Sequence, residues 1–227
     1  MAKHKKSRRK KLIIWLLVDF TIAALVFGLL LYKPSMYNPI APAAVNPDGE
    51  RVHPYLSHDL MPTLYNGAQD RRPFELVVLD GKLNEAIAQS GWLQESGGII
   101  LSAPEVLFAP GRIILMGTAD VQGAGFVITI ELGPQLNEDG LLNINVEKVK
   151  IGAMNITMLA KIMGKKMYRD RLEAGPVDTE DLRTQIVASL LNEEPFDPVF
   201  LVDDKWVRLT GVEITQGRLI AQLVPVR

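Results

Sequence analysis

Alternation of apolar and polar positions is the clearest pattern in the middle of the chain. Between Arg112 and Leu132 every second residue is apolar or small, and the alternation continues beyond the turn sequence QGAG. A period of two predicts two β-strands joined by a hairpin. The members of this apolar row are Ile113, Leu115, Gly117, Ala119, Val121, Phe126, Ile128, Ile130 and Leu132. Because the row carries no charge, we expect it on the concave, helix-covered side of a sheet.

The opposite face of the same hairpin is mixed. Thr118, Asp120 and Glu131 share it with apolar residues. We expect Ile114, Met116 and Val127 to be half covered by the preceding segment or by a neighbouring chain.

Further strand patterns lie on both sides of the hairpin. Strands are predicted at Ile99–Phe108, Arg112–Val121, Gly125–Leu132 and Leu141–Ile151, with connections that contain Gly, Pro and Asn. Short connections of this kind predict an antiparallel meander. In the last run the alternation slips between Val146 and Val149, which predicts a β-bulge. One strand at 74–79 and three strand-like runs from Pro198 onward complete the set.

A period of 3.6 residues marks the helices. A short helix is expected after Leu79, with Asp80 as N-cap and Gly91 as its end. A longer amphipathic helix is expected from Met154 to about Leu172, and a second one follows Pro176 with Asp178 or Thr179 as cap. The predicted fold class is therefore α+β: an N-terminal transmembrane helix, then a curved antiparallel β-meander covered by two or three helices.

The N-terminus carries the longest apolar run. Residues 12–31 contain one charge, Asp19, and at ~1.5 Å per residue they would span ~30 Å, the thickness of a bilayer core. We therefore predict a transmembrane signal-anchor at 12–32. Seven basic residues at 1–11 predict a cytoplasmic tail and an extracytoplasmic domain at 74–227, so the protein is expected in the cell membrane as a single-pass protein. A cleaved signal peptide, with APAAV at the cleavage site, is the alternative.

Asp19 has two interpretations. A carboxylate within a membrane helix costs ~2.5–3.5 kcal/mol on insertion scales, which the neighbouring apolar residues offset. In the first interpretation Asp19 contacts a membrane-protein partner. In the second it is a tolerated polar residue near the cytoplasmic interface.

Residues 33–73 contain seven prolines and are expected to form an extended or irregular spacer that holds the domain off the membrane. His53, His58 and Asp59 lie in this spacer. Two histidines and one carboxylate in a proline-broken loop do not make a convincing metal site.

Composition narrows the function classes. The formal net charge is −1, and without the basic tail the remainder is acidic, which argues against a nucleic-acid-binding face. The chain has no cysteine, and no histidine follows Arg72. None of the common catalytic, phosphate-binding, dinucleotide-binding or zinc motifs is present. We expect neither an enzyme nor a bound metal or cofactor.

The order of these features is similar to that of a known family. The segments FELVVLDGKLNEAI and LMGTADVQGAGFVITIELGPQLNEDGLLNINVEKVKIG, between an anchor and a helix pair, resemble the YpmS-like family of single-pass bacterial envelope proteins of unknown function. More loosely they resemble tubular lipid-binding proteins. The resemblance implies binding of lipid or another hydrophobic ligand in the cell envelope, and it transfers no catalytic residues.

Two functions are therefore expected. In the first, the domain binds a lipid from the membrane or another hydrophobic ligand, because methionine side chains form adaptable apolar linings. The ligand-lining residues would be Leu115, Ala119, Phe126, Ile128, Ile130, Met154, Met158, Ile162, Met163 and Met167. In the second, these residues form a dry core, and the protein is a non-catalytic envelope scaffold or assembly factor that acts through protein–protein contacts.

Overall fold

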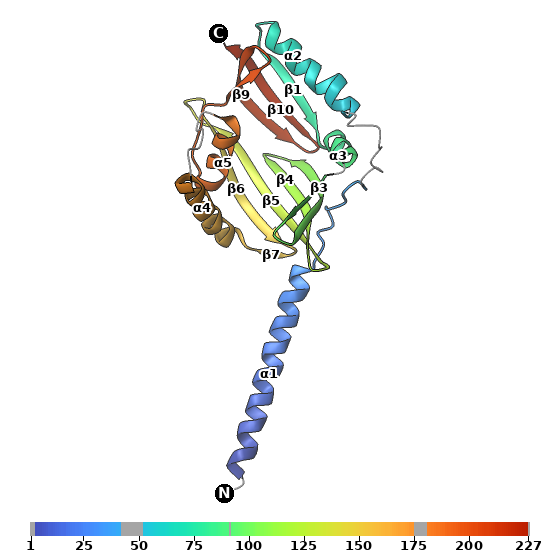
Figure 1. Cartoon of the computed structure of the whole chain (residues 1–227), viewed down its shortest axis with the longest axis vertical. Coiled ribbons are helices and arrows are strands. Elements are labelled where there is room, and N and C mark those ends of the chain that lie inside the picture. Colours follow the sequence, from blue (N-terminus) through green and yellow to red (C-terminus); the bar gives the residue numbers. More distant parts are fainter. Residues whose placement is uncertain (1–2, 42–51, 91, 175–180, 227) are drawn as a thin grey trace.

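The protein is a β-rich domain with one long helix projecting from it (Figure 1). A computed structural model describes residues 3–41, 52–90, 92–174 and 181–226. The projecting helix is α1 (Lys3–Leu30). The remaining elements form two antiparallel sheets with helices beside them, so the predicted α+β class is confirmed.

The larger sheet is a six-stranded meander in which each strand pairs with the next one along the chain. Its strands are β2 (Leu93–Ser96), β3 (Ile99–Ala109), β4 (Arg112–Val121), β5 (Ala124–Leu136), β6 (Leu142–Ile151) and β7 (Met154–Asn155). The predicted bulge is present, because Glu131 pairs with Lys148 while Leu132 pairs with Val146, which leaves Glu147 as the extra residue.

The smaller sheet has the order β1-β10-β9-β8 and lies at the end of the domain away from α1 (Figure 1). Its strands are β1 (Phe74–Leu79), β8 (Val199–Val202), β9 (Lys205–Thr215) and β10 (Arg218–Val226). The Gly111 amide donates to the Ile214 carbonyl at 3.0 Å, and the Gly217 amide donates to the Phe108 carbonyl at 2.9 Å. These bonds join the two sheets, whose separation the sequence pattern did not predict.

Two helical segments pack on the smaller sheet and correct the expectation of an irregular chain over 33–73. They are η1 (Tyr55–Leu60), a turn of π-helix, and α2 (Met61–Gln69). Pro62 is the second residue of α2, which continues directly from η1. Ala68 is 0% exposed in a core with Val207 and Leu223, so α2 belongs to the domain.

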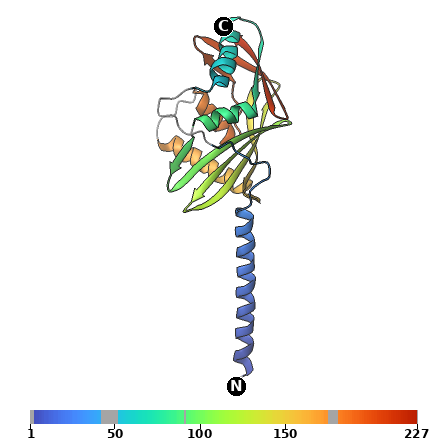
Figure 2. The same ribbon diagram turned by 90° about the vertical axis from the view of Figure 1, so that its right-hand side faces the viewer.

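Three helices stand beside the six-stranded sheet. They are α3 (Asp80–Gln89), α4 (Thr157–Ala174) and α5 (Leu182–Asn192), and they lie on the side of the sheet opposite the chain that follows α1 (Figure 2). Asn84 of α3 exchanges two 2.8 Å hydrogen bonds with the backbone of Val106 in β3. Ser189 of α5 accepts from the Ile144 amide in β6 at 2.8 Å. The helices therefore cap the free backbone groups of β3 and β6 at the two edges of the sheet.

Several predicted helix boundaries change. Met154 lies in strand β7, and α4 begins three residues later. The carboxylate of Asp80 accepts the Phe108 amide at 3.1 Å, so this residue ties α3 to β3 and does not cap the helix. The N-cap of α5 is Asp181, because its side chain accepts the Thr184 amide. Gly91, Asp178 and Thr179 lie outside the described residues.

The C-terminal end of α1 contacts the domain directly. The Ala153 amide donates to the Leu29 carbonyl at 2.8 Å. Gly152 has φ +58°, and any side chain there would collide with the carbonyl oxygens of Leu29 and Leu30. Residues 33–73 are therefore not the only link between the domain and the apolar helix, because the turn between β6 and β7 meets the end of that helix.

Candidate functional site

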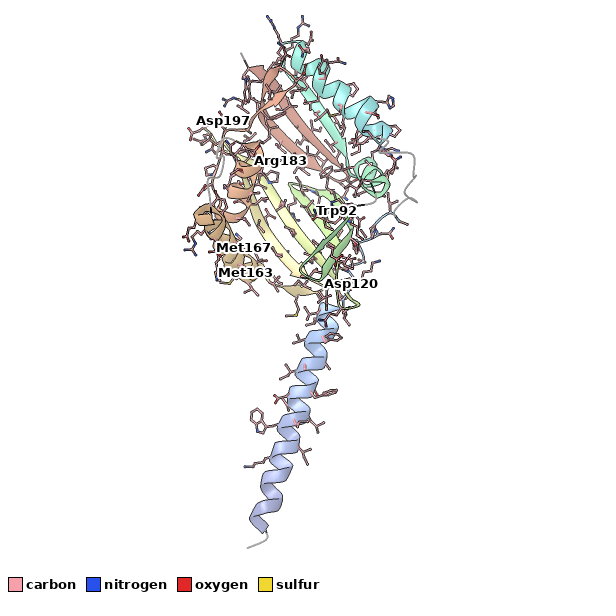
Figure 3. All side chains as sticks on the ribbon, viewed as in Figure 1. Trp92, Asp120, Met163, Met167, Arg183 and Asp197 are labelled. Atoms are coloured by element: carbon pink, nitrogen blue, oxygen red, sulfur yellow. The ribbon has the colours of Figure 1, made fainter. Side chains whose placement is uncertain are left out.

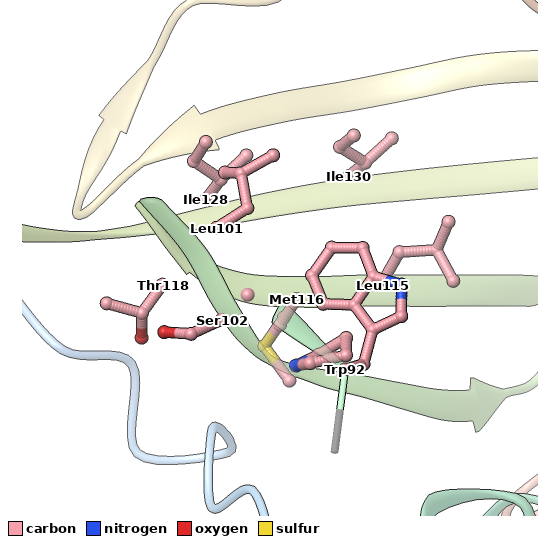
Figure 4. A pocket seen from close by; sticks show the side chains of 10 residues that line it. Trp92, Leu101, Ser102, Leu115, Met116, Thr118, Ile128 and Ile130 are labelled. Atoms are coloured by element: carbon pink, nitrogen blue, oxygen red, sulfur yellow. The ribbon is translucent and has the colours of Figure 1, made fainter. Parts of the chain in front are cut away.

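A shallow pocket of about 200 Å³ lies on the six-stranded sheet. Leu101, Leu115, Gly117, Ile128 and Ile130 from β3, β4 and β5 line it, together with Trp92 just before β2. Figure 4 shows the Trp92 indole close to Leu115, with the aliphatic side chains of the neighbouring strands around it. The rest of the lining comes from Ser102, Pro104, Met116 and Thr118. The pocket contains no charged residue, so it suits an apolar ligand.

A local irregularity in β3 accounts for the position of the pocket. The register between β3 and β4 shifts between Ser102 and Glu105, and Ala103 has φ +49°. This bulge interrupts the ladder opposite Gly117, whose missing side chain leaves further space. The sheet is therefore opened at the place where the pocket lies.

The segment after α1 contacts this bulge from the face of the sheet opposite the apolar row. The Tyr37 hydroxyl donates to the Ala103 carbonyl at 2.8 Å and also hydrogen-bonds the Thr118 hydroxyl at 2.8 Å. Tyr37 forms a buried cluster with Ile114, Met116 and Val127, which are 6%, 4% and 7% exposed. The spacer thus covers these three residues, as expected, but buries them almost fully instead of by half.

Glu105 is the buried charge of this region. It is 6% exposed, and its carboxylate accepts the Asn38 amide at 2.8 Å. Burial raises the pKa of the Glu105 carboxyl, while the Asn38 hydrogen bond and the charge of Lys33 act in the opposite direction. Burial likewise raises the pKa of the Tyr37 hydroxyl.

The apolar row faces the helix side of the sheet but is not a dry core. Only Ala119 and Leu132 are buried, and Val121 is exposed. Leu115, Phe126, Ile128 and Ile130 are half-buried, because the helices stand at the edges of the sheet and leave its centre open. Of the candidate ligand-lining residues, Leu115, Ile128 and Ile130 meet in the pocket, whereas Ala119 and Phe126 lie beyond it.

The candidate lining residues of the longer helix lie elsewhere. Met154 is half-buried in β7. The others project from α4 and are far more exposed than core residues: Met158 81%, Ile162 64%, Met163 55% and Met167 66%. Figure 3 shows Met163 and Met167 on α4, in the half of the domain nearer α1. None of these four lines the pocket of about 200 Å³.

Trp92 and Leu101 are pocket residues that the sequence interpretation missed. Leu101 is in register with Ala119 and therefore faces the same side as the apolar row. Strand pairing could have suggested it. Trp92 stands outside any periodic pattern, so no sequence signal identifies it, and in the structure it is 39% exposed.

The charged groups of the sheet gather around Glu131. Arg112 lies 2.9 Å from its carboxylate, Lys148 lies at 3.5 Å and Lys150 at 3.8 Å. These side chains alternate with the apolar row and therefore face the opposite side of the sheet. In the described part of the chain no three acidic or histidine side chains are grouped to hold a metal ion.

The helix α1 is long and apolar enough, from Ile13 to Leu30, to cross a membrane. Its side chains in this span do not pack on the domain. Asp19 lies exposed on the helix surface, and nearby Thr21 donates to the Leu17 carbonyl at 2.8 Å. Comparison of the chain with models of known families, with curated proteins and with solved structures found no match.

Proposed function

We propose that this protein is a single-pass membrane protein whose extracytoplasmic domain binds a lipid or another hydrophobic ligand. The observation that carries the proposal is the pocket under Trp92, which is apolar, uncharged and open to solvent. An exposed apolar pocket without charged groups is typical of a binding site for an apolar ligand. The adjoining apolar row extends this surface along the sheet. An extended acyl chain would need such a continuous apolar surface.

The anchor supports the same proposal. Seven basic residues at 3–11 precede the apolar span of α1, and by the positive-inside rule they favour a domain outside the cytoplasm. Because the domain contacts the end of α1, its pocket stays close to the outer leaflet. That leaflet is then the nearest source of apolar ligand. The resemblance to the YpmS-like family points in the same direction.

Replacement of a pocket residue by tryptophan tests the proposal. Ile130→Trp should fill the pocket and lower the amount of lipid that remains bound to the full-length protein by about one molecule per chain. The measurement is native mass spectrometry of protein released from detergent micelles. Leu201→Trp in exposed strand β8 is the matched control and should retain lipid as the unchanged protein does.

Thermal unfolding of both variants must match that of the unchanged protein, because an unfolded domain would also lose ligand. Ile128→Trp provides a second test at the next paired position of the pocket. Equal lipid content in all four proteins would contradict the proposal. A complete absence of lipid from all four would favour the scaffold function, in which Asp19 on the exposed surface of α1 contacts a membrane partner.

A further inference from the structure

Helix α4 carries an uncovered apolar face. Gly164 faces α5, since a side chain there would meet Leu191. With 3.6 residues per turn, the opposite side of α4 carries Met158, Leu159, Ile162 and Met163 in its first two turns. All four are at least 55% exposed. A soluble helix normally turns such a face toward its own core.

The position of this face indicates what covers it. Thr157, the first residue of α4, follows Ala153 by four residues, and the Ala153 amide is bonded to Leu29 near the end of α1. Four residues reach at most ~14 Å. The apolar face of α4 therefore begins near the level at which α1 leaves a bilayer (Figure 1).

The basic residues on the outer side of α4 follow its apolar first two turns. After the apolar first two turns, Lys165, Lys166 and Arg169 project from the same outer side and are exposed. Lys161 instead turns toward the domain and pairs with Glu193 at 2.8 Å. A helix that enters a membrane surface at an angle places apolar side chains below the headgroups and basic ones among anionic phosphates.

Neighbouring hairpins present apolar side chains at the same end of the domain. Leu93, Ile99, Ile100 and Val121 are exposed, and Ile99 pairs with Val121 near the tips of the β2–β3 and β4–β5 hairpins. Asp120, beside this tip, is at the end of the domain nearest α1 in Figure 3. Ile99 and Val121 therefore add exposed apolar side chains at the end of the domain from which α1 leaves.

We propose that the outer side of α4 docks on the outer leaflet of the membrane that α1 spans, with Met158, Leu159, Ile162 and Met163 in the interface and Lys165, Lys166 and Arg169 on anionic headgroups. This inference rests on the proposed anchoring by α1. It deepens the proposed function, because docking of α4 holds the pocket over the leaflet that supplies its ligand.

Single-cysteine variants test the docking, since the chain contains no cysteine of its own. Met163→Cys, with Leu201→Cys in β8 and Leu25→Cys in α1 as references, would be labelled with a fluorophore in the full-length protein. The proteins would be placed in vesicles of phosphatidylcholine and phosphatidylglycerol that carry a lipid-bound quencher. We expect the label at 163 to be quenched several-fold more than the label at 201, and the label at 25 to be strongly quenched.

Two further variants separate docking from ligand binding. Quenching at 163 should persist when Ile130→Trp fills the pocket, and it should fall when Lys165→Glu and Lys166→Glu repel anionic lipid. Equal, weak quenching at 163 and 201 with strong quenching at 25 would overturn the docking and leave the anchor intact. Quenching at 163 that disappears with Ile130→Trp would also overturn it, because the signal would then come from lipid in the pocket. Weak quenching at 25 would refute both the anchor and the docking.

Discussion

Glu105 shows how the segment after α1 affects the domain at the level of one residue. Its carboxyl group is buried behind the pocket and receives one backbone hydrogen bond, from Asn38. Its pKa is raised from the ordinary 4.5 mainly by burial. The folded protein therefore holds this proton more tightly than the unfolded chain does.

The sign of the resulting pH dependence follows from linkage. The contribution of Glu105 to stability is fully present below its ordinary pKa of 4.5 and is lost as pH rises through the raised value. Glu105→Gln keeps an acceptor for Asn38 and removes the buried charge. We expect its unfolding temperature to exceed that of the unchanged protein at about pH 7, with a smaller difference at about pH 4.

Thermal unfolding of the full-length protein in lipid nanodiscs would measure this difference. Glu75→Gln, on the exposed face of β1, is the control and should change the unfolding temperature little at either pH. A loss of stability in Glu105→Gln at about pH 7 would contradict the expectation, because it would mean that the ionised carboxylate stabilises the fold.

At the level of elements, α2 and the Tyr37 segment act as parts of the core. Ala68 of α2 packs on Val207 and Leu223 of the smaller sheet, and Tyr37 packs on the larger one. Three fragments separate these contributions: 34–227 retains both, 52–227 loses Tyr37 and 73–227 loses α2 as well. We expect unfolding free energies in this descending order, with the loss of α2 costing at least several kcal/mol because it exposes apolar surface at ~25 cal/mol per Å².

Urea unfolding followed by circular dichroism would rank the three fragments. A 73–227 fragment as stable as 34–227 would show that η1, α2 and the Tyr37 segment are not needed for folding. Chelator serves as a control for His53 and His58, and it should leave the unfolding midpoint of 34–227 unchanged.

The helices show most clearly where sequence interpretation succeeds and fails. Strands β3 to β6 could be predicted because alternation, turn residues and even the slip before Val149 are local signals. The sequence did not predict α2, because Pro54 and Pro62 suggested an irregular chain over η1 and α2. The burial of α2 also depends on strands about 140 residues away. The open face of α4 was missed for a similar reason, since periodicity identifies an apolar face but not what covers it.

The candidate site was predictable in part for the same physical reason. Leu115, Ile128 and Ile130 were found because strand periodicity assigns them to one face. The pocket itself depends on the positive φ of Ala103 and on the hydroxyl of Tyr37, which lies 66 positions away in sequence. No pattern in the sequence predicts the contact between Tyr37 and Ala103.

At the level of the whole molecule, orientation across the membrane is the feature to establish. We expect residues 1–11 inside and the domain outside, because the basic residues lie at one end of the anchor. Ser7→Cys and Gln216→Cys place single thiols on the two sides. A membrane-impermeant maleimide should label Gln216→Cys in intact spheroplasts and Ser7→Cys only after permeabilisation. The reverse pattern would invert the topology and place the pocket at the inner leaflet.

The contact between Ala153 and Leu29 also limits the reach of the protein. A domain on a flexible linker can search a volume that grows with linker length. Here the turn before β7 is hydrogen-bonded to the last turn of α1, so the domain lies directly against the end of that helix. In the proposed membrane anchoring this contact would keep the domain at one height above the bilayer. If the proposed anchoring and ligand binding hold, the protein would not carry a ligand between two membranes by itself. Its pocket would then receive only molecules that diffuse to it within the same leaflet or that a neighbouring protein delivers.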